Sequence, residues 1–209
     1  MPDDEIKRLS DYFELISKKY LLENFSEKEA NEFSGIFSNL LKENDPFFPD
    51  KLAKRHGINS VLVLTIAEIL ERKDKSIDFI KIHVLGIYNI IMGDYLKNLR
   101  HDFENTDQHW DSFIKFIKKG NSLNYENKYF ELEVVQESLT TFEFNITKCL
   151  YYETLKRNER PDLAPILCAY DYLLADTIHQ WVKFEREKTI ANGNQFCGFR
   201  YLRANPPID

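Results

Sequence analysis

Glycine, cysteine and positive charge are all scarce in this sequence. Its 209 residues include seven glycines and three cysteines, and 34 acidic side chains outnumber 28 lysines and arginines. None of the glycines falls in a G-x-G-x-x-G or Walker pattern, so the common phosphate-binding loops are absent. The net charge of −6 leaves no broad cationic surface for phosphates, and we expect no nucleic-acid partner. An odd number of cysteines fits a reducing compartment better than a disulfide framework.

The sequence also lacks the run of ~18 apolar residues that a membrane-spanning helix needs. Its most hydrophobic region, residues 60–99, is interrupted by ionisable side chains, namely Glu68, Glu71, Arg72, Lys73, Asp74, Lys75, Lys81 and His83. The first residues, MPDDEIKRLSDYF, are acidic and have no apolar core of the kind found in secretory signals. We therefore expect a cytoplasmic protein that has no membrane partner.

The first part of the chain has the hydrophobic spacing of helices. Apolar residues recur at three- and four-residue steps from Ile6 to Tyr20, and Ser26 with Glu29 forms a capping box for a second helix. That helix should end before NDPFFPD, whose two prolines break it. Further helices are predicted over 60–72, 76–99 and around 110–117. Residues 1–120 are therefore interpreted as a helical region.

The spacing changes to the alternation of strands after residue 129. Residues 130–134 and 142–146 alternate apolar and polar side chains, and they are followed by helices over 149–157 and from about Pro165. Residues 182–190 and 195–202 flank an Asn-Gly pair, which predicts a closing hairpin. We predict an α+β fold: a helical first half, then an antiparallel sheet in the order β-β-α-α-β-β covered by helices. Residues 121–209 form this region, and the whole chain is expected to be one compact domain.

All three cysteines lie in the last third of the chain, at Cys149, Cys168 and Cys197. A fold that gathers strand and helix ends would bring them together. The spacings of 18 and 28 intervening residues do not resemble the C-x₂₋₄-C pairs of structural zinc sites. We therefore expect no metal and no cofactor, with zinc kept as an alternative. The simplest interpretation of the three is that they are buried apolar residues.

Asp171 follows Cys168 by three residues and therefore shares its helical face. A carboxylate raises the pKa of a nearby thiol, so Asp171 suits binding a cationic group or acting as a general base, whereas a cysteine acts only if a positive charge compensates. Arg186 and Arg200 are the candidates for that charge. The scattered histidines show no H-x-x-x-H spacing, and no serine lies in a G-x-S-x-G pattern. Tyrosines that could line a cavity, but at helical spacing more often lie in the core, are Tyr151, Tyr152, Tyr170 and Tyr172.

Residues 142–201 resemble the L-2-amino-thiazoline-4-carboxylic acid hydrolase family. The resemblance rests on a strand leading into Cys149, the C-x-x-D pair of Cys168 and Asp171, and the segment TIANGNQFCGFR, which begins at Thr189 and ends at Arg200. It implies hydrolytic opening of a cyclic isothiourea or a similar amidine, in which water adds to the amidine carbon and the C–S bond breaks to give an N-carbamoyl amino acid.

The resemblance and the residue chemistry together assign candidate roles to eight residues. Cys149, Cys168, Asp171 and Cys197 are the catalytic candidates, and Arg186, Arg200, Thr189 and Tyr152 are the substrate-binding candidates. The choice among the three cysteines as nucleophile stays open. Two other functions remain as alternatives: a small-molecule-binding or sensory domain similar to 4-vinyl-reductase-like domains, without catalysis, and a structural interaction module. A small molecule is the expected partner of both the hydrolase and the sensory domain, and the oligomeric state is left open.

Overall fold

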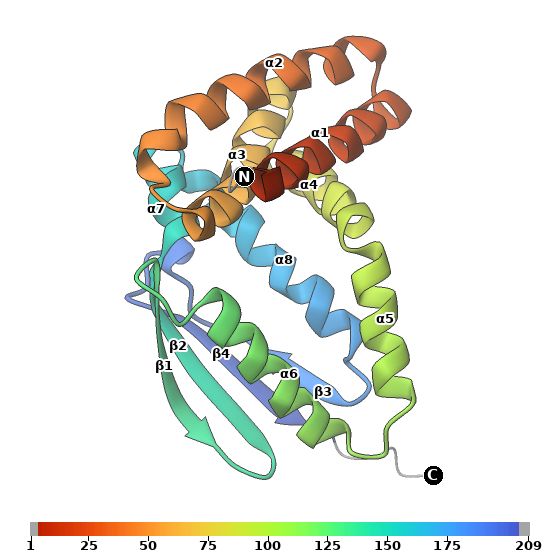
Figure 1. Ribbon diagram of the computed structural model, residues 1–209, viewed down its shortest axis with the longest axis vertical. Helices are drawn as coiled ribbons and strands as arrows, with labels where there is room; N and C mark the ends of the chain where they lie inside the picture. The colour runs from red at the N-terminus through yellow and green to blue at the C-terminus, as the bar shows by residue number, and fades with distance from the viewer. Residues whose placement is uncertain (1–3, 205–209) are drawn as a thin grey trace. The chain divides into compact units, whose positions relative to one another are not determined.

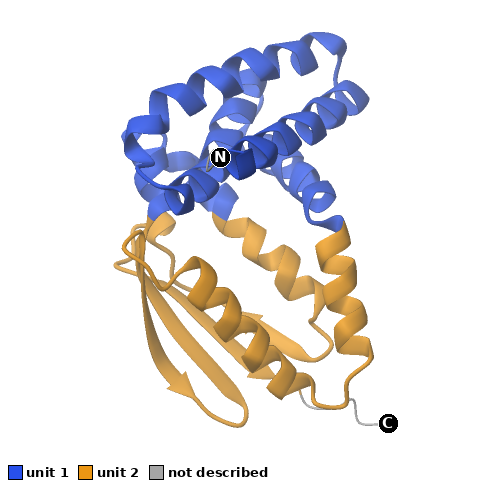
Figure 2. Ribbon diagram, in the orientation of Figure 1, with its two compact units in different colours: residues 1–93, 150–167 blue, residues 94–149, 168–209 orange. Residues whose placement is uncertain are grey.

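The computed structural model describes residues 4–204, and the chain falls into two compact units (Figure 2). Unit 1 holds the residues up to Gly93 together with Leu150–Leu167. Unit 2 holds Asp94–Cys149 together with the residues from Cys168 onward. Each unit is therefore built from two segments that are distant in the sequence.

Unit 1 is helical and is organised around one helix that is buried along most of its length (Figure 1). This central helix, α3, is apolar nearly all round, as expected for a helix enclosed by others. Helices α1, α2, α4 and α7 pack against α3. Two short helices, η1 and η2, complete the unit. Their bounds are α1 Asp4–Asn24, α2 Glu27–Asn44, η1 Asp45–Phe47, α3 Lys51–Glu71, α4 Ile77–Ile91, α7 Leu150–Arg157 and η2 Pro161–Leu163.

Side-chain caps set where these helices begin. The Ser26 hydroxyl accepts a hydrogen bond from the Lys28 N–H at the start of α2. The Asp50 carboxylate accepts one from the Ala53 N–H at 3.0 Å, so α3 begins nine residues before the predicted start at residue 60. The predicted helix over 76–99 is two helices, because α4 ends at Ile91 and another begins at Gly93. No helix within residues 4–204 is long and apolar enough to cross a membrane.

Unit 2 is a four-stranded antiparallel sheet with helices on one face. The strands lie in the order β1-β2-β4-β3, with bounds β1 Phe130–Glu137, β2 Thr141–Cys149, β3 Val182–Glu185 and β4 Cys197–Arg203. The helices are α5 Gly93–Glu104, α6 His109–Asn124 and the larger part of α8, which spans Ala164–Thr177. The predicted α+β class and the order β-β-α-α-β-β are confirmed.

Alternation along the strands gives this sheet an apolar inner face and a polar outer face. On β4, Cys197, Phe199 and Tyr201 are buried, whereas Arg200 between them is exposed. Helices α6 and α8 cover the inner face (Figure 1), where the ring of Phe113 lies 4.8 Å from that of Tyr201. An apolar layer thus forms between the sheet and these helices, as the pleat of a half-covered antiparallel sheet requires.

The predicted closing hairpin is confirmed as the antiparallel pair of β3 and β4, but the prediction of a two-residue Asn-Gly turn is wrong. Strand β3 ends at Glu185, and the chain then runs through a long loop containing the short helix η3, Ile190–Asn192. The Thr189 hydroxyl caps η3 by accepting a hydrogen bond from the Asn192 N–H, which commits Asn192 to a helical conformation. Within the Asn-Gly pair, Gly193 has a positive φ of +82° and Asn192 does not. A two-residue type I′ turn needs positive φ at both central residues.

Candidate functional site

An ion pair between Asp171 and Arg186 lies on the inner face of the sheet in unit 2. Asp171 comes from α8, and Arg186 comes directly after β3, where it continues the inward alternation of Val182 and Phe184. The Arg186 Nη1 group donates a hydrogen bond to the Asp171 carboxylate, and Nη2 donates one to the backbone carbonyl of Cys168. The Arg186 side chain is 2% exposed, which makes this one of the few buried charges of the chain.

Aromatic rings enclose the Arg186 guanidinium. Its central carbon lies 5.1 Å from the ring centre of Tyr172, 5.5 Å from that of Phe184 and 5.2 Å from that of Phe199. Such contacts favour the charged form and hold the planar group in place. The Nε atom is buried and has no hydrogen-bond partner among residues 4–204. One donor of this guanidinium is therefore unsatisfied within the described residues.

Asp171 is an unusual carboxylate because burial and Arg186 act on it in opposite directions. Burial raises the pKa of Asp171 above its ordinary value, and the charge and hydrogen bond of Arg186 oppose this shift without cancelling it. A quarter of the Asp171 side chain is exposed, so this side chain is only partly buried. A raised pKa makes Asp171 a stronger base than a solvated aspartate, which favours a role in proton transfer.

Two of the three predicted cysteines lie beside this ion pair. Burial raises the pKa of the Cys168 thiol to about 12, with Asp171 and Cys197 adding to the shift and Arg186 opposing it. Burial also raises the pKa of Cys197, although the Ile190 N–H donates to its sulfur at 3.2 Å. Both thiols are thus protonated at neutral pH, a state in which cysteine is a weak nucleophile.

The third cysteine, Cys149, ends β2 and pairs with Phe130 on β1. It is half-buried and interacts electrostatically with Tyr125 at the end of α6, and Tyr125 in turn interacts with Asp171. The structure therefore brings Cys168, Asp171, Arg186 and Cys197 into one group, with Cys149 linked to it through Tyr125.

Three tyrosines complete the surroundings of Asp171. Burial raises the pKa of Tyr125, Tyr170 and Tyr201, and the charge of Asp171 raises each further. Each keeps its phenol proton and can act as a hydrogen-bond donor. Sequence reasoning considered Tyr170 only as a lining or core residue and missed Tyr125 and Tyr201. Tyr201 could have been found by parity, because it is two and four residues from the inward-facing Phe199 and Cys197.

The other predicted binding residues lie elsewhere. Arg200 projects from the outer face of the sheet, where it pairs with Glu143 at 2.6 Å and with Glu185 at 3.2 Å, so it does not join Arg186. Thr189 is buried and caps η3. Tyr152 lies on α7, in unit 1. Among residues 4–204, no group of three or more histidine, cysteine or acidic side chains is arranged to hold a metal ion.

Fold and site together define an α+β protein with a buried ion pair, two protonated thiols and three phenols on the inner face of its sheet. The chain belongs to the L-2-amino-thiazoline-4-carboxylic acid hydrolase family, which it matches over residues 62–201, two thirds of its length. That span contains every residue of the group around Asp171. The family predicted from residues 142–201 is therefore confirmed.

Comparisons with other proteins are more distant. No curated protein gives a significant match to this chain. Among solved structures, the chain is similar to the Fe(II) unliganded H-NOX protein from K. algicida, with a TM-score of 0.43 and 8% identity over 95% of this chain and 98% of that one. A mutant of the same protein gives a TM-score of 0.41 and 8% identity over 92% of this chain and 95% of that one. Likenesses at this level carry no argument about function.

Proposed function

We propose that this protein hydrolyses a small cyclic isothiourea or related amidine, in the manner that its family name describes. The observation that carries the proposal is the Asp171–Arg186 pair, a buried carboxylate of raised pKa held by a fixed guanidinium inside the region that matches the family. The substrate of the family name, L-2-amino-thiazoline-4-carboxylic acid, combines an amidine carbon, a ring sulfur and a carboxylate. Each of these has a complementary group around Asp171.

Water is the nucleophile that these surroundings favour. Cys168 and Cys197 both have raised pKa values, so neither is an activated thiolate in the resting protein. Asp171 accepts a proton from water while the oxygen attacks the amidine carbon. The hydroxyl proton of the adduct passes to the ring nitrogen as the carbamoyl C=O forms. The C–S bond breaks at the same time, and the ring sulfur leaves with its electron pair and takes the proton from Asp171. The product is a free thiol carrying an N-carbamoyl group, so one water molecule accounts for every atom gained.

The remaining groups bind and orient the substrate. We assign the Nε atom of Arg186, which has no hydrogen-bond partner within residues 4–204, the role of donor to a substrate oxygen such as the carboxylate; because Nε is buried, binding requires local opening around it. The phenols of Tyr125, Tyr170 and Tyr201 stay protonated and can donate to oxygen or sulfur as negative charge develops on them. Cys168 and Cys197 provide polarisable contacts for the ring sulfur.

The test is turnover of L-2-amino-thiazoline-4-carboxylic acid, followed by mass-spectrometric detection of the N-carbamoyl product. We expect Asp171→Asn to lower kcat by about 10²–10⁴-fold, the usual contribution of a general base. Asp176→Asn is the matched control, because Asp176 is an exposed aspartate on the same helix. Cys168→Ala should retain at least a tenth of the turnover, since Arg186 contacts the backbone carbonyl of Cys168 and not its thiol. A loss as large as that of Asp171→Asn would make Cys168 the nucleophile.

A second function, binding without catalysis, is favoured by the same raised thiol pKa values and by the neutralisation of Asp171 by Arg186. Such a protein would hold an amidine-containing molecule in a sensory role. The two functions separate in one experiment on the unaltered protein. Saturable binding of the thiazoline carboxylate with no N-carbamoyl product supports the sensory domain, whereas product formation abolished by Asp171→Asn supports the hydrolase.

A further inference from the structure

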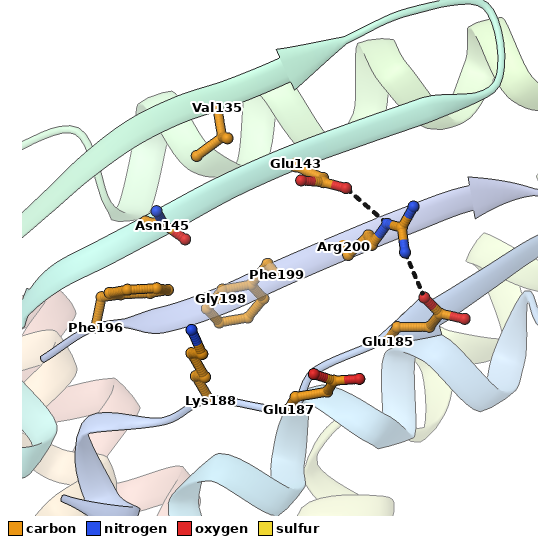
Figure 3. A pocket seen from close by; sticks show the side chains of 10 residues that line it. All are labelled: Val135, Glu143, Asn145, Glu185, Glu187, Lys188, Phe196, Gly198, Phe199 and Arg200. Atoms are coloured by element: carbon orange, nitrogen blue, oxygen red, sulfur yellow. Dashed lines mark hydrogen bonds and ion pairs between the residues drawn. The ribbon is translucent and has the colours of Figure 1, made fainter. Parts of the chain in front are cut away.

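The outer face of the sheet in unit 2 carries a hollow that the proposed hydrolysis does not use (Figure 3). Its volume is about 300 Å³, and it lies over β2, β4 and the loop that follows β3. Small-molecule sites in proteins span roughly 300–1,000 Å³, so a hollow of this size suits a small metabolite. Arg200, which lines the hollow, and Arg186 project from opposite faces of the sheet, and Phe199 both lines the hollow and contacts the Arg186 guanidinium.

The floor of the hollow contains a glycine that neither backbone nor packing explains. Gly198 lies in the interior of β4 and pairs with Asn145 in a regular ladder without a bulge. Its φ is not positive, and a Cβ there would meet only Phe196 at 3.4 Å and the Asn145 side chain at 3.6 Å. Glycine inside a strand costs about 0.5–1 kcal/mol, and it often marks a place where a ligand approaches the backbone. That last explanation is the one left for Gly198.

The loop after β3 is fastened beside this glycine. The Gly198 N–H donates a hydrogen bond of 3.0 Å to the backbone carbonyl of Lys188, so Glu187 and Lys188 are held at the rim of the hollow. The Lys188 ammonium group lies 5.2 Å from the ring centre of Phe196, which lines the same hollow (Figure 3). Two consecutive residues of opposite charge are thereby presented to one cavity.

The charges in the hollow divide into a paired set and an unpaired set. Arg200 is bracketed by Glu143 and Glu185, and Glu185 also pairs with Lys183 at 2.6 Å, so these four charges compensate one another. Within residues 4–204, neither Glu187 nor Lys188 forms an ion pair. A simple anion would meet the carboxylates of Glu143, Glu185 and Glu187, and a simple cation would leave Lys188 uncompensated. A molecule carrying both charges satisfies both residues.

We propose that this hollow binds a free α-amino acid in its zwitterionic form. Its ammonium group lies at Glu187, its carboxylate at Lys188, its Cα over the bare floor of Gly198 and its side chain against Phe196. An apolar side chain of moderate size suits the contact with Phe196 and Val135, which also lines the hollow. The site is independent of the proposed hydrolysis and would make the protein responsive to an amino acid.

Titration of the intact protein with L-leucine, followed by NMR or calorimetry, tests the charge pattern. The matched probes are 3-methylbutylamine, which is leucine without its carboxylate, and 4-methylpentanoate, which is leucine without its ammonium group. We expect saturable leucine binding and at least tenfold weaker binding of each half-molecule, because each leaves one charge of the hollow uncompensated. Equal affinity for leucine and a half-molecule, or no saturable binding at millimolar leucine, overturns the proposal.

Variants of the hollow locate the binding. Gly198→Leu should abolish leucine binding, and Gly198→Ala, whose methyl group meets ordinary contacts, should weaken it without lowering the melting temperature. Glu187→Gln and Lys188→Gln should each raise Kd about tenfold. The control is Glu133→Gln, an exposed acid on β1 outside the hollow. Leucine binding that survives Gly198→Leu or Glu187→Gln unchanged overturns the assignment.

Failure of this proposal is distinguishable from failure of the hydrolase proposal. Asp171→Asn should leave leucine binding intact, because Asp171 lies with Arg186 on the inner face. Loss of leucine binding in Asp171→Asn but not in Gly198→Leu would place the amino acid beside Asp171 and end the proposal. Absence of thiazoline hydrolysis in the unaltered protein bears only on the hydrolase.

Discussion

At the scale of single residues, the pairing of Asp171 with Arg186 decides what the inner face of the sheet can do. A buried carboxylate without a partner is unfavourable, and a buried guanidinium without one is equally so. Each therefore makes the other tolerable, and their mutual position is fixed by the hydrogen bond from Arg186 to the Cys168 carbonyl. The pair gives the unit a polar centre in an otherwise apolar layer.

Removal of one partner should therefore harm the fold more than removal of both. We expect Arg186→Leu to lower the free energy of unfolding by about 3 kcal/mol, toward the lower end of the range for broken buried pairs, since a quarter of Asp171 is exposed. The double variant Asp171→Leu/Arg186→Leu should be more stable than Arg186→Leu alone. Urea unfolding of the double variant and of both single variants measures the coupling, and effects of Asp171→Leu and Arg186→Leu that simply add would show that the pair is not coupled.

Single residues also show how far sequence reasoning reaches. The i to i+3 spacing of Cys168 and Asp171 predicted their shared face, because that relation depends only on helical geometry. Arg186 and Arg200 could not be ranked, because the face on which each projects depends on the strand register and on where β3 ends. Tyr125 was missed since its approach to Asp171 depends on how α6 packs against the sheet, which no local pattern encodes.

At the scale of secondary-structure elements, a buried acid joins the start of α2 to the turn after α3. Glu29 is 1% exposed, receives a hydrogen bond from the Ser26 hydroxyl and pairs with the ammonium group of Lys73. The Lys73 interaction, followed by that with Ser26, lowers the pKa of Glu29 to about 2, and burial opposes this shift. The predicted capping pair Ser26–Glu29 thus has a tertiary role besides marking a helix start.

This pair predicts a pH dependence of stability. As pH falls below about 4.5, the unfolded chain takes up a proton at Glu29 before the folded chain does, so the stability that Glu29 contributes declines until pH 2. We expect Glu29→Gln to cost about 1–2 kcal/mol at pH 6, since the 41% exposure of Lys73 allows solvent screening, and nearly nothing at pH 2. Thermal unfolding of both proteins across this range measures the difference.

An exposed ion pair between α6 and β1 serves as the control for the buried Glu29. Lys118 and Glu137 are both nearly half exposed, so Glu137→Gln should change stability by less than about 0.5 kcal/mol at either pH. A stability difference between Glu29→Gln and the unaltered protein that is as large at pH 2 as at pH 6 would contradict the lowered pKa.

At the scale of the whole molecule, the chain builds each compact unit from two distant segments, and this is the feature that sequence patterns could not supply. Helix content and strand alternation predicted the α+β class, because both depend on local spacing. The assignment of residues 150–167 to the same unit as residues 1–93 depends on contacts between distant segments. The predicted division into 1–120 and 121–209 follows composition, and it stays a prediction.

The second segment of unit 1 is tied to the first by polar side chains as well as by packing. His56 shares a hydrogen bond of 2.7 Å with the Tyr151 hydroxyl, and Arg160 donates to the Glu71 carboxylate at 2.6 and 2.9 Å. Removing residues 150–167 would expose the apolar surface of α3 that α7 covers and would remove these hydrogen bonds.

We therefore expect residues 1–93 alone to lack a cooperative unfolding transition, although their helices have good local signals. A chimera that joins residues 1–93 to residues 150–167 through a flexible glycine-serine linker should recover that transition, because it restores the contacts of α7 with α3. Far-UV circular dichroism during thermal unfolding measures both. If fragment 1–93 melts as sharply as the chimera and at the same temperature, α7 is dispensable and residues 150–167 are not needed for unit 1 to fold.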